Sequence, residues 1–342
     1  MFKTEILLGV VALSIGLVHS LCSDCDENPA DSWDFVISSE GQLEFYSNQT
    51  KTNSEGTDFW ELSALAYDAV NNVLFFVDRG NDNTTIFSFN LTTKKFQPLT
   101  KKKQLENVES MAFDPVKRML FWTDTMERSI FWMSLMPDSE NDGNGHLLIK
   151  MKHYTPELIA VDSCRGYIYW TSVQHNSMAS IERSKFDGSE REVIVHTDLY
   201  MPRGLAIDQR TKRLYWADEK EGERFSIESS NLEGEDRQIL LNGSHLRLIN
   251  TLTVSEDWIY WVDLGFYNTV WKLAKDKQNV EPMLVVTLSK NTFGVVANYG
   301  IPECETLPRT LPNKAAKFNN SRNALLALVL YFCIFTVPFH FY

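Results

Sequence analysis

The sequence lacks the motifs that mark common hydrolases. It has no G-x-S-x-G nucleophile elbow and no H-E-x-x-H zinc motif. Its seven histidines are scattered, and His153, His175, His196 and His245 stand in loop-like contexts, where a lone histidine is more often a surface residue than a general base. The polar loop at residues 138–145 lacks the spaced ligands and the distal glutamate of an EF-hand. We therefore predict no catalytic residue, no metal site and no cofactor.

Positive charge is also scarce. The chain carries 33 lysines and arginines against 45 aspartates and glutamates, which gives a formal net charge of −12. This balance argues against binding to nucleic acid or to an anionic membrane surface, and it weakly favours a basic partner. The alternative is that the acidic surface only keeps the protein soluble. The basic run Lys101-Lys102-Lys103 is interpreted as a solvated loop between repeats.

An apolar segment of the kind used for targeting occurs at the N-terminus. Lys3 precedes an apolar stretch from Ile6 to Val18, and Val18-His19-Ser20 forms a small-residue cleavage site. Residues 1–20 are therefore predicted to be a secretory signal peptide, since the apolar run is short for a membrane span.

A second apolar segment, residues 324–342, ends the chain with no charged residue after it. The positive charges lie before it, which is the reverse of what a type I span prefers. The pattern fits a glycosylphosphatidylinositol signal with attachment at Asn313 or Ala315, and a C-terminal membrane span stays open as the alternative. Residues 305–323 are interpreted as stalk and spacer. Either anchor predicts a location at the extracellular face of the cell membrane.

Between these ends, a strand with an aromatic pair recurs five times. The pairs begin at positions 75, 121, 169, 215 and 260, so the steps are 46, 48, 46 and 45 residues. A period of about 40–45 residues with four short strands is typical of a β-propeller blade. Upstream of most pairs an Ala-x-Asp sequence ends another strand. Its aspartate is expected to accept hydrogen bonds from turn amides; these residues are Asp68, Asp114, Asp162 and Asp208.

Five copies do not close a ring, so the chain ends must supply a sixth. Asp34 to Ser38 has the shape of a degenerate aromatic strand, and Gln42 to Tyr46 is predicted to be the strand after it. Phe293 to Asn298 matches the innermost strand, Arg203 to Asp208. We therefore predict an all-β, six-bladed β-propeller over residues 33–304. Its last blade would take the inner strand from the C-terminus and the outer strands from the N-terminus, which leaves no open sheet edge.

The repeat is most complete at residues 201–241, where it reads P-x-G-L-A-x-D, L-Y-W-x-D, L-x-G and R. This pattern resembles the YWTD (class B) repeats of the low-density lipoprotein receptor family, over roughly residues 33–304. The resemblance implies a propeller that binds protein ligands at one mouth of its central channel. The chain differs from those receptors because it has no evident six-cysteine EGF-like module.

Candidate ligand residues follow from the position equivalent to Arg203, at the start of each inner strand. They are Ser63, Glu109, Glu157, Arg203, Asn250 and Phe293. Residues just after each aromatic strand would flank this ring, namely Arg79, Thr125, Met126, Glu219, Leu264 and Phe266. The alternative is that the ring only packs the rim of the channel. The tryptophans of the aromatic strands are interpreted as core between blades; these are Trp122, Trp170, Trp216 and Trp261.

Secretion predicts disulfides and glycans. The candidate cysteines are Cys22, Cys25, Cys164 and Cys304. One N-terminal cysteine is expected to bridge Cys304 and the other to reach Cys164, although the sequence does not determine the connectivity. Five Asn-x-Ser/Thr sequons lie in polar contexts, at Asn48, Asn83, Asn90, Asn242 and Asn319.

Binding is therefore the predicted activity. The chain is expected to be a surface-tethered protein that recognises an extracellular or cell-surface protein in adhesion, signalling or germ-cell development. A scavenging or endocytic co-receptor is one alternative, which would need a partner because no cytoplasmic tail is evident. A calcium-dependent hydrolase built on the same kind of propeller is the other.

Overall fold

A computed structural model describes residues 33–56, 59–104, 106–137, 139, 143–174, 178–220, 224–244, 249–264, 267–275, 280–300 and 304. Their regular structure is entirely strand. No helix among them is long and apolar enough to cross a membrane. The strands are β1 (Phe35–Ser39), β2 (Gln42–Ser47), β3 (Thr50–Glu55), β4 (Leu62–Asp68), β5 (Val73–Asp78), β6 (Ile86–Asn90), β7 (Lys95–Pro98), β8 (Val108–Asp114), β9 (Met119–Asp124), β10 (Ser129–Ser134), β11 (His146–Lys150), β12 (Thr155–Asp162), β13 (Tyr167–Gln174), β14 (Met178–Lys185), β15 (Glu192–Val195), β16 (Met201–Asp208), β17 (Arg213–Lys220), β18 (Arg224–Asn231), β19 (Gln238–Ser244), β20 (Ile249–Val254), β21 (Trp258–Leu264), β22 (Asn268–Ala274), β23 (Met283–Leu288) and β24 (Thr292–Ala297).

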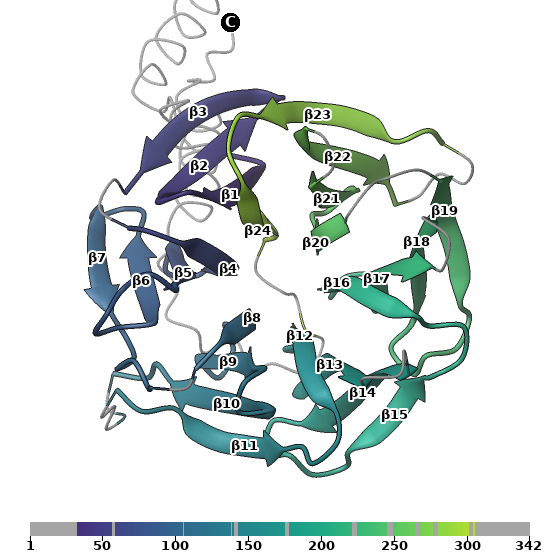
Figure 1. Cartoon of the computed structure of the whole chain (residues 1–342), viewed down its shortest axis with the longest axis horizontal. Coiled ribbons are helices and arrows are strands. Elements are labelled where there is room, and N and C mark those ends of the chain that lie inside the picture. The colour runs from purple at the N-terminus through teal and green to yellow at the C-terminus, as the bar shows by residue number, and fades with distance from the viewer. Residues whose placement is uncertain are drawn as a thin grey trace, which may run out of the picture. The chain divides into compact units, whose positions relative to one another are not determined.

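Six four-stranded antiparallel sheets form a ring around a central channel (Figure 1). Blades one to five are β4–β7, β8–β11, β12–β15, β16–β19 and β20–β23, and blade six contains β24, β1, β2 and β3. The innermost strands line the channel; they are β4, β8, β12, β16, β20 and β24. The prediction of an all-β, six-bladed propeller is confirmed.

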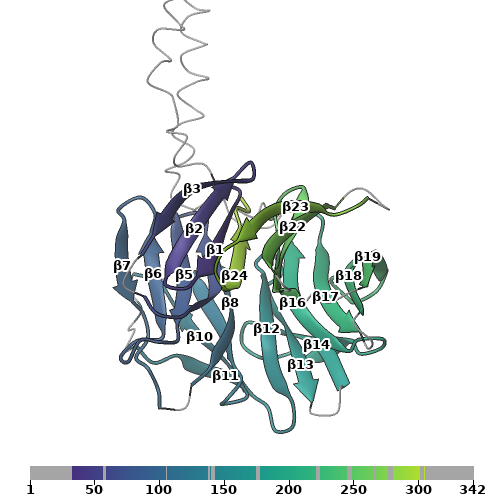
Figure 2. The ribbon, with the colours of Figure 1, turned by 45° about the horizontal axis from the view of Figure 1, so that its top comes forward.

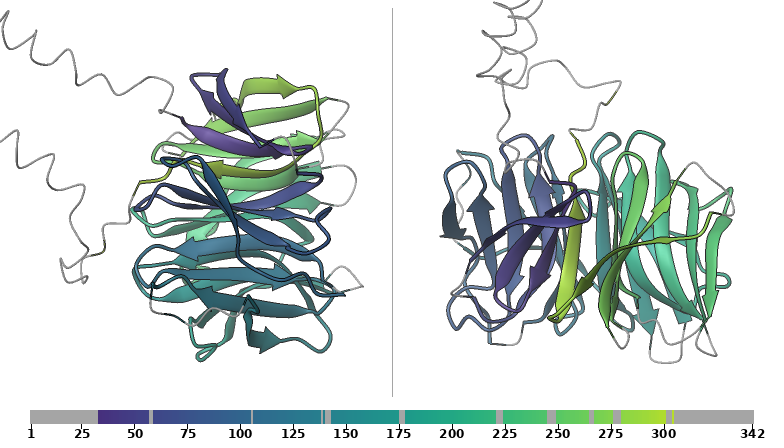
Figure 3. Two further views of the ribbon diagram at one scale, coloured as in Figure 1. Left: turned by 90° about the vertical axis from the view of Figure 1, so that its left-hand side faces the viewer. Right: turned by 90° about the horizontal axis from the view of Figure 1, so that it is seen from above.

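Blade six contains both ends of the described ring. Strand β1 pairs with β2 on one side and with the C-terminal strand β24 on the other, with Phe35 opposite Ala297. Figures 2 and 3 show β1 and β24 side by side. The ring centroids of Phe35 and of Tyr260 in blade five also lie 5.1 Å apart. Because β1 runs opposite to β24, the first described strand begins and the last one ends at the same face of the ring.

The two faces of the ring have different structures, and we name them by the inner strands. The mouth face is where each inner strand begins, and the closing face is where it ends. At the closing face, the Asp208 carboxylate accepts hydrogen bonds from the Arg210 and Thr211 amides at 3.0 and 3.2 Å. Asp68, Asp114 and Asp162 likewise accept amide hydrogen bonds from the turns that follow them. The structural role predicted for the Ala-x-Asp aspartates is confirmed.

Apolar side chains fill the space between neighbouring blades. The motif tryptophans are almost completely buried, with exposed fractions of 0–2%, as the sequence predicted. Each packs in a cluster shared by two blades; Trp216, for example, lies with Tyr169 of blade three. A disc of this kind is held together mainly by these inter-blade surfaces, because each sheet alone would leave both of its faces exposed.

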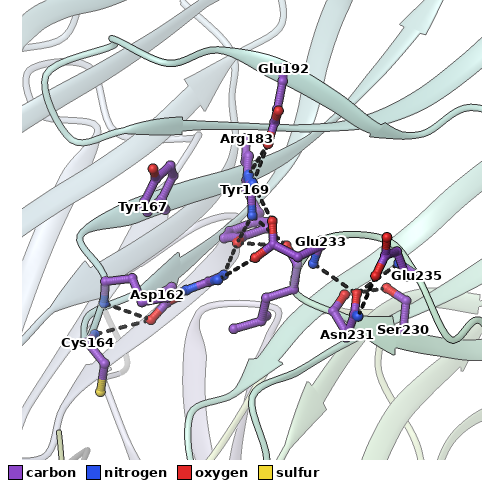
Figure 4. Close-up of polar contacts among 12 residues, drawn as sticks. Asp162, Cys164, Tyr167, Tyr169, Arg183, Glu192, Ser230, Asn231, Glu233 and Glu235 are labelled. Atoms are coloured by element: carbon purple, nitrogen blue, oxygen red, sulfur yellow. Dashed lines mark hydrogen bonds and ion pairs between the residues drawn. The ribbon is translucent and has the colours of Figure 1, made fainter. Parts of the chain in front are cut away.

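Polar contacts add a clamp between blades three and four, shown in Figure 4. Arg165 forms ion pairs with Asp162 at 2.5 Å and with Glu233 at 2.6 Å, and Glu233 also pairs with Arg183. Arg183 donates to the carbonyl oxygen of Leu232 at 2.9 Å. The turn between β18 and β19 is thereby fixed to the neighbouring blade.

Candidate functional site

Each inner strand carries a β-bulge close to its first residue at the mouth face. In β16 the register slips between Pro202 and Gly204, so that Arg203 is the extra residue. The same slip occurs in all the other blades. A bulge re-aims the side chain of its extra residue and is common at rims and next to functional sites. We call these six bulges the bulge ring.

Five of the six predicted ligand residues lie at the slips of the bulge ring: Glu109, Glu157, Arg203, Asn250 and Phe293. In blade one, Ser63 keeps its pairing with Val77, and Ala64 is the extra residue. The sequence predicted that the Ser63 side chain would be available at the mouth. It is only 3% exposed and therefore is not. The other five are partly exposed. Their role in ligand binding stays a prediction.

The bulge ring opens onto a cavity of about 220 Å³ in the channel. Glu109, Asn250 and Phe293 line it at the mouth, and the inner strands continue its wall with mostly apolar residues. Asn250 donates from Nδ2 to the carbonyl oxygen of Phe293 at 3.0 Å, which joins blades five and six at the rim. The site is therefore a fixed ring around a small, open depression.

The ring carries charges of both signs, with Glu109 and Glu157 in neighbouring blades and Arg203 in the next blade. Glu109 pairs with Arg79 at 3.0 Å, and Arg203 pairs with Glu219 at 3.0 Å, so two of the predicted flanking residues contact the ring. Burial raises the pKa of Glu157, Arg203 opposes this rise, and Glu109 adds to it. The Glu157 carboxylate thus interacts with both a positive and a negative neighbouring side chain. Such a pattern can recognise polar and charged groups of a partner by ion pairs and charge-assisted hydrogen bonds.

The aromatic motif itself holds the ring in place. Thr123 donates from Oγ1 to the carbonyl oxygen of Glu157 at 2.5 Å, across the boundary between blades two and three. The motif aspartate Asp218 accepts the Met201 amide at 2.7 Å and the Tyr200 amide at 3.0 Å. Asp78 accepts the Glu61 amide at 3.0 Å in the same way. These contacts give the threonine and the aspartate of the repeat a physical role that the sequence analysis did not assign.

Among the residues that the structure describes, three large apolar side chains are exposed in loops of the mouth face. Trp60 is 79% exposed, Tyr267 is 75% exposed and Met126 is 62% exposed. Met126 was predicted as a flanking residue, whereas Trp60 and Tyr267 were missed. Phe266, which was predicted, lies outside the described residues. Exposed aromatic and methionine side chains at a rim are typical of protein-contact surfaces.

The basic run at the mouth face is more than the solvated loop that the sequence predicted. Lys102 donates from Nζ to the carbonyl oxygens of Arg79 and Asn81 at 2.8 and 2.6 Å. Lys103 lies over the ring of Phe131, 4.1 Å from its centroid. The run therefore fastens the β5–β6 loop and the blade-two core.

The other predicted sites are spread over both faces and the flank or lie outside the described residues. Cys164 and Cys304 are disulfide-bonded, while Cys22 and Cys25 lie outside the described part. Asn48, Asn83 and Asn242 are exposed and Asn90 is partly exposed. Asn319, Asn313 and Ala315, the signal peptide, the spacer and the apolar tail lie outside it too. Among the described residues, no group of three or more His, Cys, Asp or Glu side chains could hold a metal ion.

Comparison with known proteins agrees with the repeat. Residues 166–209 match the low-density lipoprotein receptor repeat class B. Protein cueball of Drosophila virilis is 31% identical over 307 residues, which cover 85% of this chain and 48% of that protein. Protein cueball of Drosophila persimilis is 34% identical over 294 residues, covering 83% of this chain and 43% of that protein. The chain thus spans about half the length of the curated relatives it matches.

Solved structures show the same fold. A chain of the nidogen/laminin complex has a TM-score of 0.63 and 21% sequence identity, covering 80% of this chain and all of that one. A gluconolactonase from Xanthomonas campestris has a TM-score of 0.54 and 15% identity, covering 76% of this chain and 86% of that one. At these identities the likeness establishes the architecture and nothing about activity.

Proposed function

This chain belongs to the YWTD-repeat β-propellers of the low-density lipoprotein receptor class B kind, and on that premise we propose that it binds a protein ligand through its mouth face. The observation that carries the proposal is the bulge ring, which turns one residue of each blade toward the same end of the channel. The ring brings together Glu109, Glu157 and Arg203, which differ in charge. Exposed Tyr267 and Met126 stand around it. Anchors of this kind, beside a polar ring, suit a protein partner better than a small substrate.

The charge of the chain bears on the kind of partner. The net charge of −12 gives the proposed contact a preference for a basic partner, because long-range attraction would speed the encounter. We assign the chain a binding role in adhesion, signalling or germ-cell development, and no enzymatic activity.

The proposed site of action is the extracellular face of the cell membrane. The signal peptide at 1–20 and the apolar segment at 324–342 would deliver and hold the chain there. Disulfide-bonded Cys164 and Cys304 suit an oxidising compartment. The described ring begins and ends at the closing face, opposite the proposed ligand surface.

The test is a pair of charge reversals on opposite faces. Arg203→Glu combined with Phe293→Ala should abolish labelling of the partner in proximity labelling on intact cells, because it inverts one ring charge and removes the ring aromatic. Arg210→Glu reverses an exposed arginine on the closing face and should leave labelling unchanged. Arg210→Glu should leave the melting temperature nearly unchanged, because exposed ion pairs contribute little to stability. The double variant must be shown to fold by its own melting curve, because Arg203→Glu places a third carboxylate near Glu157 and Glu219. Undiminished labelling by the folded double variant would show that the partner binds another face.

A further inference from the structure

The exposed tryptophan of the mouth face lies beside a glycosylation sequon. Trp60 is 79% exposed, which is unusual for the largest apolar side chain. Its backbone amide and that of Gly80 lie at 3.4 and 3.1 Å from the same carboxylate oxygen of Asp78. A Cβ atom added to Gly80 would lie 2.4 Å from Cβ of Trp60. Trp60 therefore packs directly against the start of the loop between β5 and β6.

That loop also carries Asn83, which is exposed and is followed by Thr84 and Thr85 as a sequon requires. Three peptide units separate Asn83 from Gly80, so their Cα atoms are at most about 11 Å apart. The first sugars of an N-linked glycan on Asn83 could span such a gap. The apolar C–H face of a pyranose ring is complementary to the electron-rich face of an indole.

The loop backbone is held firmly, which fixes the attachment point of such a glycan. Asn81 accepts the amides of Asn83 and Thr84 through Oδ1 at 2.9 and 3.0 Å. From the other side, the Lys102 amide donates to the carbonyl oxygen of Asn83 at 2.9 Å. Lys102 also binds two loop carbonyl oxygens through Nζ. A fixed attachment point limits the glycan to the part of the mouth face within its reach, which includes Trp60.

We propose that an N-linked glycan on Asn83 covers Trp60 and marks the border of the ligand-binding surface at blade one. The inference rests on the secretory route of the proposed function, but not on the identity of the ligand. The glycan shields an apolar side chain that would otherwise bind other proteins nonspecifically. It also leaves the bulge ring and the rim of blades two to five, with Met126 and Tyr267, as the surface open to a partner.

The test uses the full-length chain produced in animal cells. Glycopeptide mass spectrometry measures occupancy of Asn83, and hydroxyl-radical footprinting measures the oxidation rate of Trp60 in the folded protein. In the native glycoprotein we expect Asn83 to be occupied and Trp60 to oxidise severalfold more slowly than after enzymatic removal of the glycans or in Asn83→Gln. Tyr267, on blade five, serves as the internal reference and should react equally in all samples.

Asn48→Gln is the matched control, since Asn48 is an exposed sequon in the β2–β3 turn at the closing face. It should leave the rate at Trp60 unchanged. An unoccupied Asn83 in a chain glycosylated elsewhere, or equal rates at Trp60 with and without the glycan, would overturn the proposal while leaving the proposed function intact. A chain with no glycan at any sequon would instead contradict the secretory route itself.

Discussion

Replacing Asp208 with alanine is expected to lower the free energy of unfolding by about 3–5 kcal/mol. Asp208 is fully buried, and it accepts a hydrogen bond from the Tyr299 hydroxyl at 2.6 Å and an ion pair from Lys275 at 2.5 Å. The carboxylate thus joins blade four to blade five and to the segment that follows β24. Its loss would leave the 6%-exposed Lys275 ammonium as a buried charge without this partner. Equilibrium unfolding in urea measures the difference.

The same carboxylate makes stability depend on pH in a defined direction. Burial would raise the pKa of Asp208, but hydrogen bonds from Lys275, Tyr299 and Thr211 outweigh it and hold the pKa below its ordinary value. The unfolded chain therefore takes up the proton first as the pH falls. The stabilisation is fully present above about pH 4 and is lost as the pH drops through the folded-state pKa. Asp208→Ala should remove this part of the acid sensitivity.

Asp236→Ala is the control for that measurement. Like Asp208, Asp236 forms an ion pair with a basic side chain, here Arg213 at 2.7 Å. The Asp236 side chain, however, is 59% exposed. Its loss should lower the free energy of unfolding far less than the loss of Asp208, because water screens an exposed pair and solvates the remaining charge. Equal losses for Asp208→Ala and Asp236→Ala would show that the buried cluster does not join the blades.

Replacing Trp216 with alanine is expected to cost about 3–5 kcal/mol of unfolding free energy. The indole has no exposed surface and packs between blades three and four with Tyr169 and Leu205. Alanine would remove this apolar contact and leave a cavity that the rigid strands on either side could only partly fill. The loss should appear as a lower denaturation midpoint with an unchanged slope.

Trp60→Ala provides the matched comparison, because it removes the same side chain from an exposed site. It should change the unfolding free energy by no more than about 0.5 kcal/mol. A large loss at Trp60, or a negligible one at Trp216, would contradict the assignment of the motif tryptophans to the core between blades.

Much of the fold could be predicted because the repeat has a local physical cause. The aromatic pairs recur every 45–48 residues, and each pair indicates a strand that is buried between blades. Each Ala-x-Asp aspartate reports a turn whose amides need acceptors. The pairing of β1 with β24 is a contact between residues about 260 positions apart. The only local sequence signal for it was the weak similarity of the segments around Phe35 and Val295 to strands of the repeat.

The candidate site was less predictable, because its features arise from register and exposure. The position equivalent to Arg203 in each repeat located five of the bulge residues. In blade one it gave Ser63, where pairing of Ser63 with Val77 leaves Ala64 as the extra residue. The exposure of Trp60 and Tyr267 depends on how loops of different blades lie on the mouth face. Their local sequence places them outside the aromatic motif, but it does not show that their side chains face solvent.

The most direct test of the mouth face as the binding surface is site-specific photo-crosslinking on intact cells. A photoreactive phenylalanine analogue replaces Tyr267, which is an exposed aromatic at the mouth, or Arg210, which is exposed at the closing face. We predict a covalent adduct with one cell-surface or secreted protein from position 267 and none from position 210. An adduct from position 210 alone, or from neither position in a correctly folded chain, would contradict binding at the mouth.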